Sequence, residues 1–167
     1  MGGRAKGKER SAGVLLFRRR GPDVEVLLIK PGGPYWTSRD VGAWQIPKGL
    51  IEEGESPLVA AMREAEEELG TPLADTPEPL ATVRQAGGKL VEAFALEQDL
   101  DHETVRSNTY RMEWPPKSGA WAEFPEVEIA RWFPLRKAET MMLTSQKPLL
   151  YALEDRLKSS GSAPPSR

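Results

Sequence analysis

The stretch GLIEEGESPLVAAMREAEEELG, residues 49–70, holds the strongest structural signal in the chain. Ser56 is a residue type that accepts hydrogen bonds from the first N–H groups of a helix, and Pro57 fits a first turn. Apolar residues then recur at helical spacing and predict one buried stripe: Leu58, Ala61, Met62, Ala65 and Leu69. Gly70 is the residue type expected just past a helix end. We therefore predict a helix over residues 56–70.

Three acidic residues occupy one sector of this predicted helix. Glu64, Glu67 and Glu68 are spaced i, i+3 and i+4, so at about 100° per residue they converge beside the buried stripe. Like charges at this spacing repel one another. A hard divalent cation such as Mg²⁺ resolves the conflict, because it prefers oxygen ligands and leaves positions open for phosphate groups. A solvated acidic face produces the same pattern, and the helix alone favours that plainer interpretation.

The residues around the glutamates reverse that preference. Seven residues of fixed type follow one another at set spacings: Gly49, Glu55, Arg63, Glu64, Glu67, Glu68 and Gly70. This pattern resembles the signature of the Nudix hydrolase family, and only two of its aliphatic slots depart from the commonest choice, with Ala65 and Thr71. The resemblance implies a single-domain α/β (α+β) fold, an α/β/α sandwich around a mixed β-sheet. It also implies an enzyme that hydrolyses a diphosphate linkage.

The resemblance assigns roles to individual residues. Glu64, Glu67 and Glu68 match the family's metal-binding glutamates, and the Gly49 carbonyl matches a backbone ligand. The implied cofactor is Mg²⁺, with Mn²⁺ as a substitute, which would polarise phosphoryl oxygens and generate hydroxide from bound water. Arg63 is expected to orient the carboxylates, with phosphate contact as the weaker option, and we count it with Glu64 and Glu67 among the catalytic residues.

A second segment, PEVEIARW at residues 125–132, supplies a further acidic candidate. It resembles a segment of the dinucleoside polyphosphate hydrolases and RNA pyrophosphohydrolases within the family, where the glutamate reaches the metals. We therefore nominate Glu126 as a metal ligand and catalytic group. Glu128 is the second choice, because strand alternation would point it to the same face. The general base stays open between Glu64, Glu126 and Glu128, and an exposed strand edge is the plainer interpretation of the pair.

Candidates for substrate binding lie ahead of the signature. The segment WQIPKG, residues 44–49, resembles the entry to the signature in the same subfamilies, so Lys48 is expected near the polyphosphate. Tyr35 and Trp36 lie in a Gly- and Pro-containing loop and are candidates for stacking on a base, as is Trp114. A solvated lysine and ordinary aromatic packing are the plainer interpretations.

The expected substrate is a nucleoside diphosphate linked to another moiety. Residues 84–88 carry neither the Pro nor the Tyr that marks an ADP-ribose or a dinucleoside polyphosphate preference in some subfamilies. Diadenosine polyphosphates or nucleoside triphosphates are preferred on the resemblance of residues 44–49 and 125–132 alone. ADP-ribose or a nucleotide sugar stays an alternative, and so does a 5′-triphosphate RNA end. A non-catalytic nucleotide sensor with the same fold is the rival function, but such proteins usually lose a signature glutamate. The sequence leaves monomer and homodimer open.

Composition sets outer limits on these expectations. The 167 residues suit one domain, and 23 Lys plus Arg nearly balance 25 Asp plus Glu, which argues against a general nucleic-acid coat. The absence of cysteine excludes disulfides, thiolate zinc sites and cysteine nucleophiles. No window approaches the ~20 apolar residues of a membrane span, so we expect a cytoplasmic protein. Residues 1–10 and 159–167 are predicted to be disordered tails around a Nudix domain at 11–158.

The remaining sequence predicts mainly strands. Extended patterns occur in six runs: 12–19, 24–30, 44–51, 80–85, 89–96 and 127–133. Gly87-Gly88 is a strong hairpin signal between two of them. A final helix is expected from about Pro148, whereas residues 99–124 are expected to be irregular.

Overall fold

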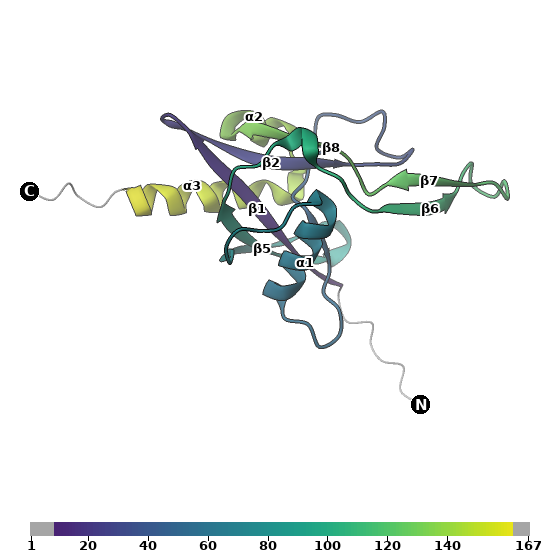
Figure 1. The fold of residues 1–167 in the computed structure, drawn as a ribbon, viewed down its shortest axis with the longest axis horizontal. Helices are drawn as coiled ribbons and strands as arrows, with labels where there is room; N and C mark the ends of the chain where they lie inside the picture. Colours follow the sequence, from purple (N-terminus) through teal and green to yellow (C-terminus); the bar gives the residue numbers. More distant parts are fainter. Residues whose placement is uncertain (1–8, 162–167) are drawn as a thin grey trace, which may run out of the picture.

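The computed structural model describes residues 9–161 and has a mixed sheet at its centre (Figure 1). The strand order is β4-β5-β1-β2-β8, with β3 paired to β1 beside this path. The strands are β1 (Arg10–Arg20), β2 (Asp23–Pro31), β3 (Lys48–Leu50), β4 (Glu78–Arg84), β5 (Leu90–Glu97) and β8 (Val127–Pro134). β1 and β5 are parallel, and the other pairs are antiparallel.

Helices cover both faces of this sheet. Helix α1 (Pro57–Leu69) lies on one face, and helices α2 (Leu135–Met141) and α3 (Lys147–Gly161) lie on the other (Figure 1). Alternation along β1 explains the two layers: Val14 and Leu16 pack in the core under α1, whereas Leu15 and Phe17 pack in the core under α2 and α3. The predicted single-domain α/β/α sandwich around a mixed sheet is confirmed.

The ends of α1 follow the predicted capping chemistry. The Ser56 hydroxyl accepts a hydrogen bond from the Val59 N–H at 3.2 Å. Gly70 has a φ of 69°, a left-handed conformation that favours glycine, and its N–H donates to the Glu66 carbonyl at 2.8 Å. The buried side of the helix is made of small and aliphatic residues: Ala60, Ala61, Ala65 and Leu69. The helix therefore lies close to the sheet, and its polar side chains line one border of that contact.

Both predicted hairpins are present. β1 and β2 pair up to Arg20 and Asp23, around the turn at residues 21–22. β4 and β5 flank a short 3₁₀ turn, η1 (Ala86–Gly88), in which Gly87 and Gly88 both have positive φ. Two further 3₁₀ turns are η2 (His102–Thr104) and η3 (Thr144–Gln146). Of the predicted extended run 44–51, only β3 is a strand, preceded by isolated bridges at Trp44 and Gln45.

The expectation that residues 99–124 are irregular was wrong in part. β6 (Thr109–Glu113) and β7 (Trp121–Pro125) form a separate two-stranded sheet that projects from the body of the molecule (Figure 1). We call residues 109–125 the arm. Pairing of its strands joins residues on either side of the Trp114-Pro115-Pro116 segment, and two adjacent prolines hide a hairpin from a pattern-based reading.

The expected boundaries differ slightly from the observed ones. Residues 1–8 and 162–167, which hold most of the expected tails, lie outside the described residues. Within the described part, Arg10 already belongs to β1, and α3 continues to Gly161 instead of ending at 158. No helix between residues 9 and 161 is long and apolar enough to cross a membrane.

Candidate metal centre and active site

The backbone at Gly49 forms the floor of the candidate site. Gly49 pairs with Ala12, and Ala12 packs in the core under α1, so this position faces the helix. A Cβ added at Gly49 would overlap the carboxyl group of Glu64. Only glycine therefore allows the Glu64 carboxylate to lie directly against the backbone of β3. This contact gives a physical reason for the glycine that opens the signature.

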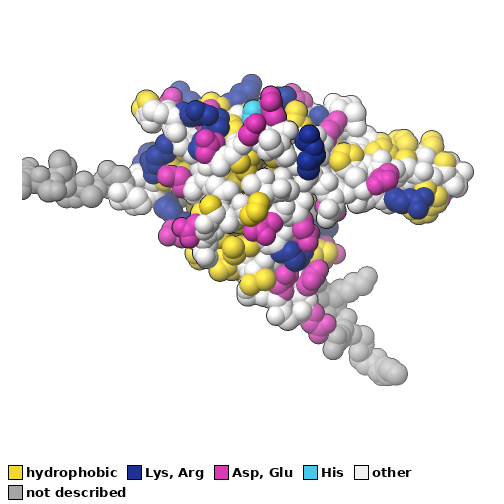
Figure 2. Space-filling model, in the orientation of Figure 1, with side chains coloured by type: hydrophobic (Ala, Val, Ile, Leu, Met, Phe, Trp, Pro, Cys, Tyr) yellow, Lys and Arg dark blue, Asp and Glu magenta, His cyan; other side chains and the backbone are white. Residues whose placement is uncertain are grey.

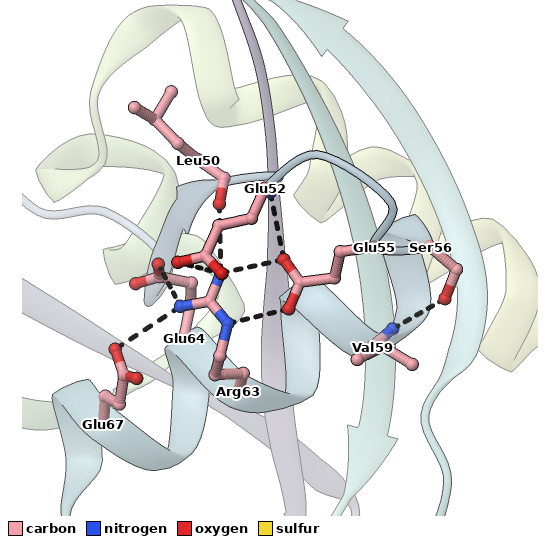
Figure 3. Close-up of polar contacts among 8 residues, drawn as sticks. All are labelled: Leu50, Glu52, Glu55, Ser56, Val59, Arg63, Glu64 and Glu67. Atoms are coloured by element: carbon pink, nitrogen blue, oxygen red, sulfur yellow. Dashed lines mark hydrogen bonds and ion pairs between the residues drawn. The ribbon is translucent and has the colours of Figure 1, made fainter.

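Arg63 links the loop after β3 to the helix (Figure 3). Its Nε and Nη2 donate to the two carboxylate oxygens of Glu55 at 2.8 and 2.9 Å, and its Nη1 donates to Glu64 Oε1 at 2.8 Å. Nη2 also donates to the Leu50 carbonyl at 3.1 Å, and Nη1 lies 3.6 Å from Glu67 Oε2. The guanidinium is thus engaged by carboxylates and backbone, the geometry of a group that orients acidic side chains.

Glu55 supports this loop. Its side chain accepts the bidentate bond from Arg63 and a further bond from the Glu52 N–H at 3.0 Å. The Arg63 hydrogen bonds, followed by the Glu52 backbone, lower the pKa of Glu55 to about 2. Glu55 therefore stays ionised and fastens the loop to α1.

Glu68 lies on the inner side of the same helix. Its Oε2 accepts a hydrogen bond from the Lys48 backbone N–H at 3.0 Å. Burial raises the pKa of Glu68 to about 8, and the negative charges of Glu64 and Glu126 add to the increase, although the Lys48 backbone bond opposes it. A carboxylate withdrawn from water among other carboxylates is a group whose charge is poorly compensated by the protein alone.

Glu126 reaches this group from the far end of the chain. It lies between the arm and β8, where its N–H donates to the Asn108 carbonyl at 2.9 Å and its carbonyl accepts from Gly32 at 3.2 Å. Burial raises the pKa of its carboxyl group, and the charges of Glu64 and Glu67 raise it further. The structure therefore brings four predicted acidic residues together: Glu64, Glu67, Glu68 and Glu126. We call them the carboxylate cluster.

Glu128 is placed elsewhere. The register between β2 and β8 shifts between Lys30 and Pro31, so the simple alternation that would put Glu128 beside Glu126 is interrupted. Glu128 is exposed and lines a cavity of about 400 Å³ together with His102 and Arg106. The expectation that it shares the face of Glu126 assumed a regular strand, and the bulge breaks that assumption.

Lys48 contacts the carboxylate cluster through its backbone N–H. In the pairing with β1, Lys48 lies opposite Gly13, one position out of phase with Gly49, so its side chain leaves the strand on the other face. Burial lowers the pKa of the Lys48 ammonium, and the charges of Glu68 and Glu64 act in the opposite direction. The contact observed with the cluster is therefore the N–H bond to Glu68, and polyphosphate binding by the side chain stays a prediction.

The aromatic candidates have different surroundings. Tyr35 is 57% exposed and contacts Trp114 of the arm edge-to-face, with ring centroids 5.4 Å apart and planes at 79°. Trp36 is half-buried, and the Arg39 guanidinium lies 5.6 Å from its ring centroid. Of the two neighbouring residues, Tyr35 therefore offers the more accessible ring.

The donor set suits a hard cation that also binds substrate. Every side-chain donor of the carboxylate cluster is an oxygen, as is the Gly49 carbonyl. Within residues 9–161, no group of three or more His, Cys, Asp or Glu side chains is arranged so that it could already hold a metal ion. Mg²⁺ commonly binds through one or two carboxylates, with water and substrate phosphates completing its shell, so an open set of carboxylates fits it.

One supporting residue was missed by the sequence analysis. Gln146 is fully buried, and its Oε1 accepts the Ile46 N–H at 3.0 Å, which fixes the segment leading into Lys48 and Gly49. A single glutamine ahead of a helix carries no local sign of such a role. The contact joins parts of the chain that are far apart in sequence, so only the folded structure reveals it.

Comparisons with known proteins identify the family of the chain and several relatives. The NUDIX domain family matches residues 7–153. An octanoyltransferase of Myxococcus xanthus is 33% identical over 109 residues, 64% of this chain and 26% of that protein. An RNA pyrophosphohydrolase of Helicobacter pylori (strain P12) is 41% identical over 64 residues, 34% of this chain and 41% of that protein. The chain thus spans less than half the length of these relatives.

A solved structure shows the same fold. A crystal structure of a C. elegans Ap4A hydrolase binary complex superposes with a TM-score of 0.64 at 20% identity, covering 89% of this chain and 98% of that one. The similarity therefore extends well beyond the signature at residues 49–70.

Proposed function

The chain belongs to the NUDIX family, and on that premise we propose that it is a Mg²⁺-dependent hydrolase that cuts a diphosphate linkage in a nucleotide substrate. The observation that carries the proposal is the carboxylate cluster: three glutamates from α1 and one from just before β8 share one electrostatic environment beside the Gly49 backbone. Mn²⁺ is the expected substitute, because it accepts the same oxygen ligands.

Different residues of the chain have different roles in the proposed reaction. The bound cation would polarise the phosphoryl oxygens and lower the pKa of a bound water. The carboxylate cluster and the Gly49 carbonyl would hold it, and Arg63 keeps the Glu64 carboxylate in place through its 2.8 Å bond. Glu126 would take the proton of the attacking water on a carboxylate oxygen, because it reaches the cluster from a different part of the chain than the three glutamates of α1.

Polyphosphate substrates are the preferred class. Dinucleoside polyphosphates and nucleoside triphosphates carry more negative charge than ADP-ribose or a nucleotide sugar, so they gain more from a centre that gathers cations. A 5′-triphosphate RNA end offers the same chain of phosphates, and an RNA pyrophosphohydrolase is among the relatives. ADP-ribose is the alternative that the test must separate from this class.

The rival proposal is a nucleotide sensor with a NUDIX fold. A sensor has no need for a complete set of metal-binding carboxylates, whereas this chain retains Glu64, Glu67 and Glu68 and adds Glu126. The full acidic set favours the enzyme.

The test is a panel of nucleotides incubated with Mg²⁺, with products separated by chromatography. We expect diadenosine tetraphosphate or a nucleoside triphosphate to show a higher kcat/KM than ADP-ribose, and EDTA to abolish turnover. Glu67→Gln is the matched control for contaminating hydrolases, because it leaves the purification unchanged. Faster cleavage of ADP-ribose would overturn the substrate class, and Mg²⁺-dependent binding without any turnover would favour the sensor.

A further inference from the structure

The arm has an open sheet edge. Its two strands pair with each other, and the outer side of β6 has no neighbouring strand within residues 9–161. β7 ends against the loop after β2, where a Cβ at Gly32 would overlap the Pro125 carbonyl. An isolated two-stranded hairpin is only marginally stable, and an exposed edge is a template for a further strand. The edge of β6 is therefore a surface on which another strand can pair.

The hydrogen bonds inside the arm decide which backbone groups of β6 face outward. The Trp114 N–H donates to the Ala120 carbonyl at 2.8 Å, in line with the pairing of β6 and β7. Every second residue back from Trp114 therefore bonds to β7. In an antiparallel sheet the residues between them turn their N–H and C=O groups to the other side. The backbone groups of Arg111 and Glu113 thus point away from β7, along the open edge.

Arg111 and Glu113 also carry opposite charges on one face of the arm, because side chains two residues apart in a strand share a face. In the described part of the chain, neither side chain makes an ion pair or a hydrogen bond. Glu123 lies opposite Arg111 across the arm but accepts a hydrogen bond from the Thr109 hydroxyl. The edge therefore presents a cation and an anion that have no fixed partner.

The other face of the arm is apolar. Tyr110 and Met112 of β6 lie opposite Phe124 and Ala122 of β7, and the ring centroids of Tyr110 and Phe124 are 6.0 Å apart. All four side chains are only partly buried. Figure 2 shows hydrophobic side chains gathered on the arm, with charged side chains beside them. Additional strands stabilise a small sheet that has one hydrophobic face, so the arm gains from a wider sheet.

We infer that β6 pairs antiparallel with β6 of a second copy of this chain, across a two-fold axis at Met112. The backbone bonds form only in registers that set Arg111 opposite itself, Thr109 or Glu113 of the second copy, because these residues share the outward phase. Opposite itself, Arg111 meets a like charge, and opposite Thr109 it gains no ion pair. The axis at Met112 instead sets Arg111 opposite Glu113 of the second copy, and the symmetry repeats this pair. The edge is thus complementary to itself, and the inference does not depend on the proposed function.

The test is sedimentation equilibrium of the full chain at a series of concentrations. We expect the wild-type protein to dimerise. Arg111→Glu and Glu113→Arg each set like charges opposite one another on both sides of the axis, so each should weaken dimerisation by about 10- to 100-fold. The double variant Arg111→Glu/Glu113→Arg reverses both charges and should dimerise as wild type. Glu123→Arg is the matched control, because it changes the same face of the arm on β7, and should leave dimerisation unchanged.

An equimolar mixture of the two single variants gives a second readout. When one copy carries Arg111→Glu and the other Glu113→Arg, each acidic side chain meets a basic one across the axis. The mixture should therefore form heterodimers, although neither variant dimerises well alone, and misfolding of a variant cannot produce such a rescue. A wild-type protein that stays monomeric at every concentration, a mixture as weak as its components, or an equal loss in Glu123→Arg would each overturn the inference.

Discussion

The carboxylate cluster and the arm are held in place in different ways. Around Gly49, the loop and α1 interlock through Arg63, which binds Glu55 twice, Glu64 once and the Leu50 carbonyl (Figure 3). The arm has its own two-stranded sheet and meets the body near its base and at Trp114 (Figure 1). The proposed chemistry thus belongs to a region fixed by dense local contacts, whereas the arm is fixed to the body by few.

Glu126 connects the two regions. Its backbone is hydrogen-bonded to Asn108 and Gly32 beside the arm, whereas the negative charges of Glu64 and Glu67 raise the pKa of its carboxyl group. A change in the arm's position would therefore be transmitted to one member of the cluster only. The comparison predicts that substitutions in α1 abolish turnover, and that substitutions in the arm alter substrate affinity.

The largest effect is expected from the cluster itself. Glu67→Gln and Glu68→Gln should each lower kcat/KM by about 10³-fold or more, because a bound metal supplies several kcal/mol of transition-state stabilisation. The melting temperature should stay level or rise, since each change removes a like-charge repulsion. Steady-state kinetics at saturating Mg²⁺ measure the first effect and thermal unfolding the second. Near-wild-type turnover in either variant would remove that residue from the metal site.

The pH dependence of stability should differ with and without metal. The pKa of Glu68 is raised to about 8 in the folded protein, above its ordinary value near 4.5, so the folded state favours the protonated form. This stabilisation is complete below pH 4.5 and is lost as the pH rises through 8. In EDTA, the free energy of unfolding should therefore fall by about 3 kcal/mol from pH 5 to 8.

The free energy of unfolding at each pH is measured by urea denaturation, and two controls accompany the experiment. Mg²⁺ at pH 8 should restore stability, because a cation replaces the lost proton as the partner of the carboxylate. Glu68→Gln should show a much flatter profile in EDTA. A wild-type profile that is equally flat would mean that the Glu68 carboxylate is solvated and that the cluster is less crowded than its geometry indicates.

Glu126 tests the link between the two regions. Glu126→Gln should lower kcat by about 10²-fold with little change in KM, as expected for the loss of general-base assistance. Glu128→Gln is the matched control, because it lies two residues away, is exposed and faces the cavity beside His102. A larger loss in Glu128→Gln would show that the bulge in β8 places the other glutamate at the reacting water.

The smallest expected effects are losses of stability from a glycine-to-alanine substitution, made once at the end of α1 and once in the arm. Gly70 and Gly119 both have positive φ, but a Cβ at Gly70 would overlap the Arg106 carbonyl, whereas the space around Gly119 is open. Gly70→Ala should lower the free energy of unfolding by about 2 kcal/mol, and Gly119→Ala by about 1 kcal/mol or less. Urea denaturation measures both. Equal losses would mean that the arm unfolds together with the body and is less independent than its contacts suggest.

The parts of the molecule that could be predicted from sequence are those encoded locally. The α1 boundaries follow from Ser56 and Gly70, and both hairpins follow from the turn residues between their strands. The carboxylate spacing on α1 is a property of one helix, and the residues of fixed type around it made Glu64, Glu67 and Glu68 candidates for metal binding. The convergence of Glu126 on them could be chosen only through resemblance, because the pairing of β8 with β2 joins opposite ends of the domain.

The features that escaped prediction depend on irregular or distant pairing. The arm was missed because Pro115 and Pro116 interrupt its pattern, and the contact between Trp114 and Tyr35 exists only after folding. The direction of the Lys48 side chain depends on its register with Gly13, which the sequence does not specify. The face of Glu128 was misjudged because a bulge changes the alternation that a regular strand would follow.

The position of β8 late in the sequence also affects the order in which the molecule folds during synthesis. Ile29 of β2 pairs with Ala130 of β8, so one edge of the sheet forms only after a strand that is synthesised much later than β2. Non-local pairings of this kind slow folding, because a long loop must close before the contact forms. A nascent chain can already contain α1 and three glutamates while Glu126 is still inside the ribosome. The carboxylate cluster is therefore completed only after residue 126 has been synthesised, and a chain terminated before that residue would carry the family signature without its fourth acidic group.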